Sequence, residues 1–192
     1  GTYKTIVVDT IDFLYTHIYN EVCDGLGVSS PTEMDDWGAT WGVIKRTFSQ
    51  TINKILALDC GKVFISHDVE KEITLRDGTK TDRVQPTMAK QALHEIEAVV
   101  DIIGCYDYDG EDRYLHIDGK QNIVAKARPE ENFIIRGGSP GVPGDRVKSI
   151  FMGRSSKESY ANLVKAFENR QVTADGRPRM KEKLLMKKKK DE

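Results

Sequence analysis

The residue whose position most suggests chemistry is Asp9, an acid at the end of a short apolar run. Residues 5–8 read Thr-Ile-Val-Val, and their β-branched side chains predict a buried strand of a parallel sheet. A carboxylate that follows such a strand lies at the carboxyl edge of the sheet, where open α/β sheets bind ligands. Carboxylate oxygens bind Mg²⁺, directly or through water. Asp9 is therefore a candidate magnesium-supporting residue; alternatively, it only caps the helix that follows.

A second polar group, His67, follows another apolar run. Residues 62–65 read Lys-Val-Phe-Ile and predict a second short strand. Between the two predicted strands, apolar residues at helical spacing predict helices over 10–26 and 35–58. Parallel pairing needs a long crossover of this kind, so we expect the strands to be parallel neighbours with Asp9 and His67 at one edge. The alternative for His67 is a half-buried histidine that only packs.

The next segments predict a hairpin, a helix and further strands. Polar and apolar residues alternate over 68–85 around Asp77 and Gly78, a typical hairpin turn. A helical pattern returns over 86–100. Three short runs then predict antiparallel strands that continue the sheet, at 99–107, 113–117 and 121–127. The predicted fold is an α/β domain whose parallel strands have helical crossovers and are continued by short antiparallel strands.

The last third of the chain changes in composition and charge. Gly and Pro are dense over 134–154, which predicts a linker, and the pattern that follows predicts a helix over 155–170. Residues 176–192 carry eight Lys or Arg and three acids, whereas the whole chain has a net charge of -1. We expect 171–192 to be a basic, disordered tail that can contact phosphates without sequence selectivity.

Composition argues against two classes of protein. No apolar run approaches the roughly 20 residues that cross a bilayer, so a membrane protein is not expected. The three cysteines lie far apart in apolar stretches, which favours reduced thiols over disulfides or a metal site and indicates a cytoplasmic protein. With 39% hydrophobic residues, a chain of 192 residues is long enough for one compact domain.

Taken in order, three motifs resemble those of a RecA-like AAA family that is found largely in bacteriophages. They are Val-Val-Asp-Thr at 7–10, Val-Phe-Ile-Ser-His at 63–67 and Ala-Lys-Ala-Arg at 125–128. The resemblance covers roughly residues 3–133 and implies a partial RecA-like P-loop NTPase core over 1–133. Members of the family are phage nucleotide-binding proteins, and some are similar to RecA-type single-strand annealing recombinases. The implied function is ATP binding in DNA recombination or single-strand annealing, in the cytoplasm of a bacterial host.

The resemblance also implies roles for the residues at the ends of the two strands. Asp9 is expected to be the Walker B acid, which supports Mg²⁺ through water beside the bound ATP. Thr10 and Ser66 are expected to lie beside the nucleotide. His67 is expected to sense the γ-phosphate and to pass its state to the DNA-facing segment that follows.

Two basic residues, Lys126 and Arg128, occupy the third motif. The resemblance implies that they reach across a subunit interface to the neighbour's nucleotide, in a homo-oligomeric ring or filament. Positive charge at a transferring phosphoryl group is what makes such residues useful. The family's Lys-Asp-Arg variant appears here with Ala127 in the middle, which keeps both charges. The alternative is that the two side chains share a solvated strand face.

Two motifs of the family are not found in these 192 residues. No segment matches the phosphate-binding pattern G-x-x-x-x-G-K-[ST], and the strand ending in Asp-x-Glu that should precede Asp9 is also missing. We therefore expect the chain to be the carboxyl-terminal part of a longer protein, in which ATP hydrolysis takes place. The alternative function is a non-catalytic nucleic-acid-binding or assembly module on a degenerate RecA-like scaffold.

The resemblance places single-stranded DNA at the predicted hairpin of residues 68–85. Acids are interspersed with its basic residues, so position rather than composition supports contact with phosphates. Three tyrosines further along can stack bases or simply pack on a sheet. The candidate phosphate contacts are Lys71, Arg76, Lys80 and Arg83, and the tyrosines are Tyr106, Tyr108 and Tyr114.

Overall fold

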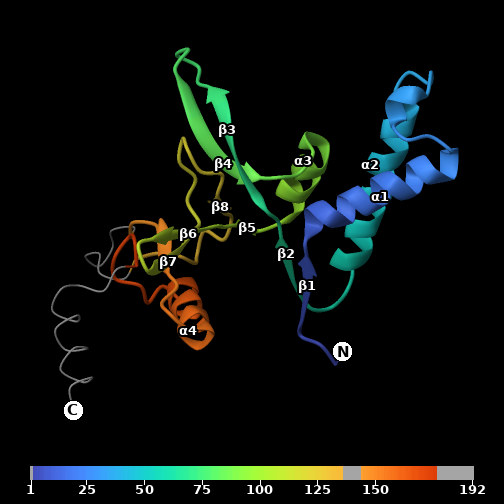
Figure 1. Cartoon of the computed structure of the whole chain (residues 1–192). Helices are drawn as coiled ribbons and strands as arrows, with labels where there is room; N and C mark the ends of the chain where they lie inside the picture. The colour runs from blue at the N-terminus through green and yellow to red at the C-terminus, as the bar shows by residue number, and fades with distance from the viewer. Residues whose placement is uncertain (1, 136–143, 177–192) are drawn as a thin grey trace. The chain divides into compact units, whose positions relative to one another are not determined.

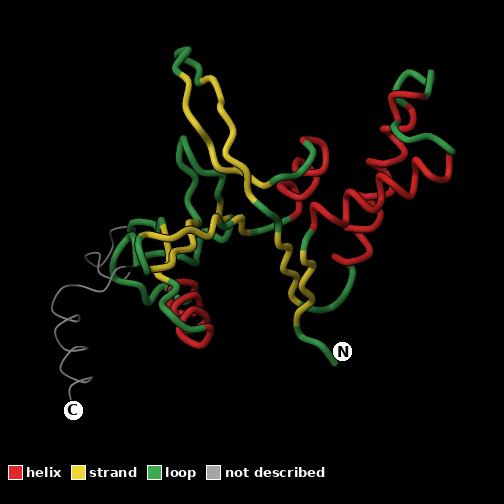
Figure 2. The backbone as a smooth tube through the Cα atoms, in the orientation of Figure 1, coloured by secondary structure: helices red, strands yellow, loops and turns green. Residues whose placement is uncertain are grey.

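A computed structural model describes residues 2–135 and 144–176 and divides the chain into two compact units. The first unit contains the chain up to residue 71 together with residues 85–100. The second contains residues 72–84 and the chain from residue 101 onward. Figure 1 labels the elements and Figure 2 shows the helices and strands along the same backbone.

The first unit begins with two parallel strands joined by two helices. Strand β1 (Thr5–Asp9) leads into α1 (Ile11–Leu26), and α2 (Ala39–Leu56) leads into β2 (Gly61–Ile65). The two strands pair in parallel with Thr5 opposite Gly61 and Asp9 opposite Ile65. This arrangement confirms the predicted pair of parallel strands with a helical crossover. A short 3-10 helix, η1 (Pro31–Glu33), lies between α1 and α2, and α3 (Lys90–Val99) completes the unit.

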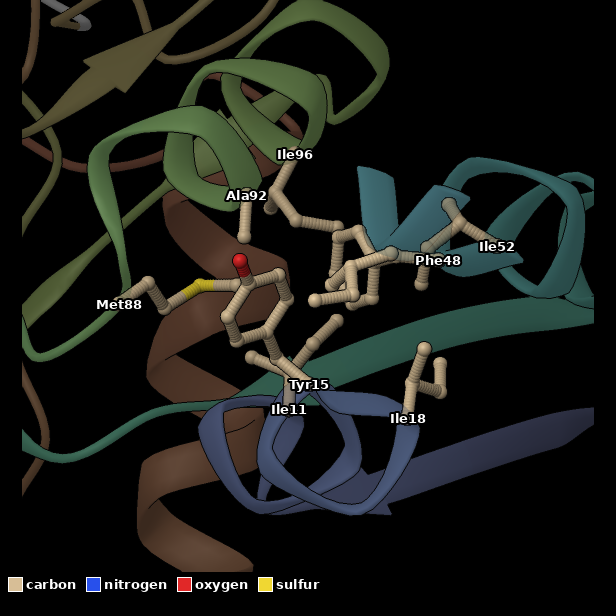
Figure 3. Close-up of a cluster of buried hydrophobic side chains, with 9 residues drawn as sticks. Ile11, Tyr15, Ile18, Phe48, Ile52, Met88, Ala92 and Ile96 are labelled. Carbon is tan, nitrogen blue, oxygen red and sulfur yellow. The ribbon is translucent and has the colours of Figure 1, made fainter. Parts of the chain in front are cut away.

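One hydrophobic cluster joins the three long helices of this unit. Figure 3 shows side chains from all three helices meeting, with the ring of Tyr15 close to that of Phe48. Their centroids are 5.3 Å apart with the rings nearly perpendicular, a favourable aromatic arrangement. The buried members lie at helical spacing, as the sequence predicts: Ile11, Tyr15 and Ile18 in α1, Ile44, Phe48 and Ile52 in α2, and Met88, Ala92 and Ile96 in and before α3.

Only one face of the β1–β2 sheet packs against these helices in the described residues. Val8 and Phe64 contact the helical cluster, whereas Val7 and Val63 on the opposite face are 55% and 45% exposed. The β-branched run predicts a strand buried on both faces, and the structure differs because α1, α2 and α3 all cover the same side. The two strands nevertheless fix where their carboxyl ends lie, which positions the site described below.

The charged segment after β2 forms the predicted hairpin. Strands β3 (Asp68–Thr74) and β4 (Lys80–Pro86) pair with each other. At the turn, Gly78 has a φ of 85°, which favours glycine, and the Thr79 amide donates to the Asp77 carboxylate over 2.9 Å. Residues 72–84 of the hairpin belong to the second unit, and its two ends belong to the first.

The second unit contains short antiparallel strands and one helix. Strands β6 (Cys105–Asp109), β7 (Asp112–His116) and β9 (Ser149–Phe151) form one sheet in that order. Strands β5 (Ile102–Ile103) and β8 (Lys126–Ala127) form a separate pair. Helix α4 (Ser156–Phe167) begins after Ser155, whose hydroxyl accepts the Glu158 amide and caps the helix. The core of the unit is formed by Ile117, Phe133, Val147, Ile150 and Ala166.

Two features of this unit differ from the expectations. The antiparallel strands do not continue the β1–β2 sheet but form sheets of their own. Alternation of polar and apolar residues predicts that neighbouring segments pair, but it does not predict which sheet the paired strands join. The range 134–154, expected to be a linker, contains β9 and the buried residues Val147 and Ile150. A short apolar run between Gly and Pro residues was enough to form a strand once β7 offered it an edge.

The expected basic tail is partly ordered where it leaves α4. Gln171 is only 6% exposed, and its side-chain amide donates to the Ser149 and Thr173 carbonyls. The Lys148 and Ser149 amides both donate to the Ala174 carbonyl. The rest of the predicted tail, 177–192, lies outside the described residues. The first six residues of the predicted tail therefore pack beside β9.

Candidate functional site

The carboxyl ends of β1 and β2 bring Asp9 and His67 to one edge of the sheet. Asp9 is the last residue of β1 and is paired in register with Ile65, two residues before His67. Both Asp9 and His67 are exposed to solvent. The Ser66 hydroxyl donates to the His67 carbonyl over 2.9 Å and so braces the turn after β2. The expected placement of Asp9 and His67 is thus found.

The structure adds a residue that the sequence analysis did not single out, Asp12. Its Oδ2 atom lies 2.7 Å from Nδ1 of His67. The side chain of Asp12 is 15% exposed, and that of His67 is 59% exposed. Asp12 belongs to the first turn of α1, which starts directly after β1 and therefore leads from the same sheet edge. Its place three residues after Asp9, at the start of a helix, is the signal in the sequence that points to it.

The pair changes the acid–base properties of both groups. The hydrogen bond to Asp12 is the main cause that raises the pKa of His67, and the negative charges of Asp12, Asp9 and Asp68 act in the same direction. Burial acts to raise the pKa of Asp12, but the hydrogen bond from His67, its own backbone and the nearby Thr10 hydroxyl outweigh burial and hold it below its ordinary value. The two shifts agree in favouring an imidazolium beside a carboxylate.

The backbone of His67 also closes the base of the hairpin. Its carbonyl accepts the Thr87 amide over 2.9 Å, directly after β4 ends at Pro86. Because β3 begins at Asp68, His67 lies where the hairpin leaves β2 and meets the chain where the hairpin returns. The side chain of His67 thus contacts α1 while its main chain contacts the segment before α3.

A shallow pocket of about 330 Å³ opens beside Asp12. Its walls come from the first turns of α1 and the segment before α3: Asp12, Phe13, Tyr15, Thr16, Thr87, Met88 and Ala89. Two oxygens at this place, Thr10 Oγ1 and Asp12 Oδ1, are buried. The Thr10 hydroxyl lies close enough to Asp12 to help lower the pKa of its carboxyl.

The acid at this edge suits Mg²⁺ that is bound together with a phosphate. Asp9 ends β1 with a carboxylate, the ligand type that Mg²⁺ prefers. In the part of the chain that the structure describes, no cluster of three His, Cys, Asp or Glu side chains forms a metal cage. Proteins usually hold Mg²⁺ with one or two carboxylates, while water and phosphate supply the remaining ligands.

Lys126 and Arg128 do not share the sheet of Asp9. Lys126 lies in β8, where it pairs with Ile103 of β5, and the Arg128 amide donates to the Asp101 carbonyl. Because the later strands were expected to continue the sheet of Asp9, Lys126 and Arg128 were expected at the same sheet edge as Asp9 and His67; β8 pairs with β5 instead, so this expectation is wrong. The physical reason is that the alternation of residues in a strand determines on which face of a sheet each side chain lies, but not which sheet the strand joins.

The candidate DNA contacts on the hairpin differ in whether their side chains already bind other residues of the protein. Nζ of Lys80 lies 2.8 Å from Glu72, and Nε of Arg83 donates to the Gln121 carbonyl over 2.9 Å. Lys71 and Arg76 are exposed, and no ion pair of either is found among the described residues. Arg76 lies in the turn of the hairpin and is the candidate best placed to meet a phosphate.

The three candidate stacking tyrosines fall into two groups. Tyr114 is buried at 5% exposure, packed against Phe151, so the packing alternative holds for it. Tyr106 and Tyr108 are 45% and 63% exposed and lie edge to face on β6, with ring centroids 5.7 Å apart. They alternate with Asp107 and Asp109, whose charge disfavours a phosphate backbone nearby.

Comparison with known proteins agrees with this geometry. A family model described as an AAA domain matches residues 1–129, about two-thirds of the chain. The chain belongs to the AAA domain family. Its function is of the nucleotide-binding ATPase type, with ATP and Mg²⁺ as the usual ligands of the family. The match includes both strand ends, the hairpin and the Lys126–Arg128 motif. Neither the curated proteins nor the solved structures gave a significant match.

Within residues 2–135 and 144–176, no helix combines the length and the apolar character needed to cross a bilayer.

Proposed function

We propose that this chain is part of a RecA-like ATPase of the phage type that binds MgATP and acts on single-stranded DNA in recombination or annealing. The observation that carries the proposal is the parallel pairing of β1 and β2, which sets Asp9 and His67 at one edge. Open α/β sheets bind nucleotides outside the carboxyl ends of their strands. The AAA family match supports nucleotide binding. The order of the three sequence motifs supports the RecA-like type.

The two strand-end residues have different roles in this proposal. Asp9 would hold the water shell of Mg²⁺ as the Walker B acid, with the Thr10 hydroxyl beside it. Bound Mg²⁺ would neutralise negative charge that develops on the β- and γ-phosphate oxygens. His67 is the sensor, and its exposed ring faces the position of the terminal phosphate. Ser66 steadies the turn that carries His67 through its hydrogen bond to the His67 carbonyl.

The hairpin is the element through which nucleotide state reaches DNA. A shift of His67 toward or away from a phosphate acts on both ends of the hairpin, since its carbonyl accepts the Thr87 amide and β3 begins at the next residue. DNA phosphates bind the basic side chains of the hairpin, with Arg76 and Lys71 as the main contacts. Lys80 and Arg83 contribute less because other partners engage them.

The proposal includes a homo-oligomer, a ring or a filament, with nucleotide between subunits. Lys126 and Arg128 then contact the nucleotide of the neighbouring subunit. Contact in trans does not require them to share a sheet with Asp9 of their own chain. The positive charge that both residues keep is the property that stabilises a phosphoryl group during transfer.

The deciding experiment is ATP hydrolysis by the natural protein that carries these residues, with Asp9→Asn. We expect a loss of about 100-fold or more in kcat, the usual effect of removing one electrostatic group from a transition state. Asp24→Asn, a change at an exposed acid of α1, is the matched control and should keep the wild-type rate. Full activity of Asp9→Asn would show that Asp9 does not support the metal. A natural protein that binds DNA but never hydrolyses ATP would favour the non-catalytic module.

A further inference from the structure

We propose that Asp12 is a positioning residue for His67, which holds the imidazole so that Nε2 is presented to the nucleotide phosphate. The inference rests on the proposed function, because His67 must face a phosphate for the orientation to matter. Neither the family motifs nor the strand-end pattern assigns a role to Asp12. Its contribution comes from the geometry of the first turn of α1.

The place of the Asp12 carboxylate is fixed by the core. The neighbouring residue Ile11 is 1% exposed, and Tyr15, one turn later, is 9% exposed. Both belong to the cluster shared with α2 and α3, so the first turn of α1 cannot move independently of the helices. Asp12 lies between these anchors with a side chain that is 15% exposed. Its Oδ2 atom is therefore a fixed acceptor at the sheet edge.

His67 needs such an acceptor because the rest of its ring is free to rotate. The side chain is 59% exposed, and its one ring contact among the described residues is an edge-to-face approach to Phe13 at 6.0 Å. The 2.7 Å bond from Nδ1 to Asp12 holds the ring in one orientation and leaves Nε2 for another partner. A carboxylate that fixes the orientation and tautomer of a histidine is a recurring device in active sites.

The charges around His67 decide what Nε2 can do. Acids act on it from three elements: Asp12 in α1, Asp9 at the end of β1 and Asp68 at the start of β3. All three favour the imidazolium, which donates from Nδ1 to Asp12 and from Nε2 to a phosphate oxygen. A neutral ring held by Asp12 would instead offer Nε2 only as an acceptor, which a phosphate oxygen does not match.

The ordinary alternative is a surface ion pair of little consequence. Exposed pairs between flexible side chains contribute about 0–1 kcal/mol to stability and have no required orientation. Asp12 differs because its side chain is only 15% exposed and because Ile11 and Tyr15 anchor its helix turn in the core. Burying a carboxylate costs solvation free energy, and charged groups that are buried at such a cost are typical of functional sites.

The first test observes the pair without nucleotide. Titration of the histidine resonances by NMR in the 192-residue chain should give His67 a pKa above its ordinary value, with Nδ1 protonated in the neutral form. Asp12→Asn should lower that pKa and mix the two tautomers. Asp24→Asn, a change at an exposed acid of α1, is the matched control and should leave the His67 titration unchanged. An unchanged His67 titration in Asp12→Asn would overturn the inference.

The second test measures ATP hydrolysis by the natural protein with His67→Ala, Asp12→Asn and both together. We expect Asp12→Asn to lower kcat by about 10-fold or more, as removal of an orienting partner does in metal sites. The double variant should be no slower than His67→Ala, because Asp12 acts only through His67. Asp12→Glu, which keeps the charge, should recover part of the rate. In the wild type the rate should fall as pH rises through the His67 pKa, and Asp12→Asn should move this fall to lower pH.

The outcomes separate the two proposals. Full activity of His67→Ala would remove the sensor role and with it the phosphate contact, whatever NMR shows of the pair. A slow His67→Ala beside a fully active Asp12→Asn would leave the proposed function standing and overturn only the role of Asp12. Additive losses in the double variant would also overturn it, because they would mean that Asp12 acts independently of His67.

Discussion

At the scale of residues, the site is defined by which groups meet at the end of β1 and β2. Asp9 and His67 are separated by 58 positions in the chain and reach one edge because two parallel strands end together. Asp12 joins them only because α1 starts at the same edge and turns its first residues toward His67. The chemistry of the site thus depends on one strand pair and one helix start.

The Asp12–His67 pair predicts a pH window for stability. The pKa of His67 is raised above 6.5, so its contribution to stability is complete below pH 6.5 and is lost as pH rises through the folded pKa. The pKa of Asp12 is lowered below 3.8, so its contribution is complete above pH 3.8 and is lost as pH falls. Both contributions are complete only between these two values.

Thermal unfolding of the chain and of Asp12→Asn from pH 3 to 9 checks this window. The difference between their midpoints should be largest between about pH 4 and 6.5 and should shrink on both sides. Asp24→Asn should follow the wild type across the whole range. A difference independent of pH would mean that the pair does not titrate as described.

At the scale of elements, α1 is the part that positions the site, and its two ends are built differently. The helix starts after Thr10, whose side chain makes no capping hydrogen bond. It ends at Gly27, whose φ of 69° is left-handed and whose amide donates to the Asp24 and Cys23 carbonyls. Gly25 lies inside the same helix, and a Cβ atom at either glycine would meet nothing within 4 Å. The two glycines therefore differ in backbone conformation and not in the room available for a side chain.

Replacing each glycine by alanine should change stability in opposite directions. Gly27→Ala should destabilise the chain by about 1 kcal/mol, because an L-residue is strained at a left-handed φ. Gly25→Ala should stabilise it by about 0.5–1 kcal/mol, because glycine is a poor residue inside a helix. Urea unfolding followed by circular dichroism measures both changes. Shifts of the same sign would contradict the left-handed cap at Gly27.

At the scale of the whole molecule, charge is unevenly distributed along the chain. Residues 176–192 carry a net charge of +5, and the remainder of the chain carries -6. Binding of single-stranded DNA can therefore arise from the hairpin, from the basic segment or from both. The two contributions can be separated because each phosphate contact adds to the dependence of affinity on salt.

Truncation after Gly176 combined with Arg76→Gln separates them. In the truncated chain, Arg76→Gln should reduce the slope of log affinity against log salt by about 0.7, the value for one contact on a single strand. Arg46→Gln, a change at an exposed basic residue of α2, is the matched control and should leave the slope unchanged. Complete loss of DNA binding on truncation alone would assign the affinity to residues 177–192 and not to the hairpin.

The sequence by itself determined the local elements and the positions of two site residues. Periodicity predicted α1, α2 and α3, and the apolar runs predicted β1 and β2 with Asp9 and His67 after them. The Asp77–Gly78 turn predicted the hairpin. These features are encoded within a few residues of where they occur, by side-chain spacing, turn chemistry and the long crossover that parallel strands require.

Only the tertiary structure decided which distant segments share a sheet or a contact. It separated β8, and Lys126 with it, from the sheet of Asp9, and it made β9 a core strand within a stretch that is rich in Gly and Pro. It also brought Asp12 to His67 across 55 positions of sequence. Such contacts depend on the packing of several elements at once, and no local pattern records them. The site begins with a strand-end acid, and its geometry is completed by the fold.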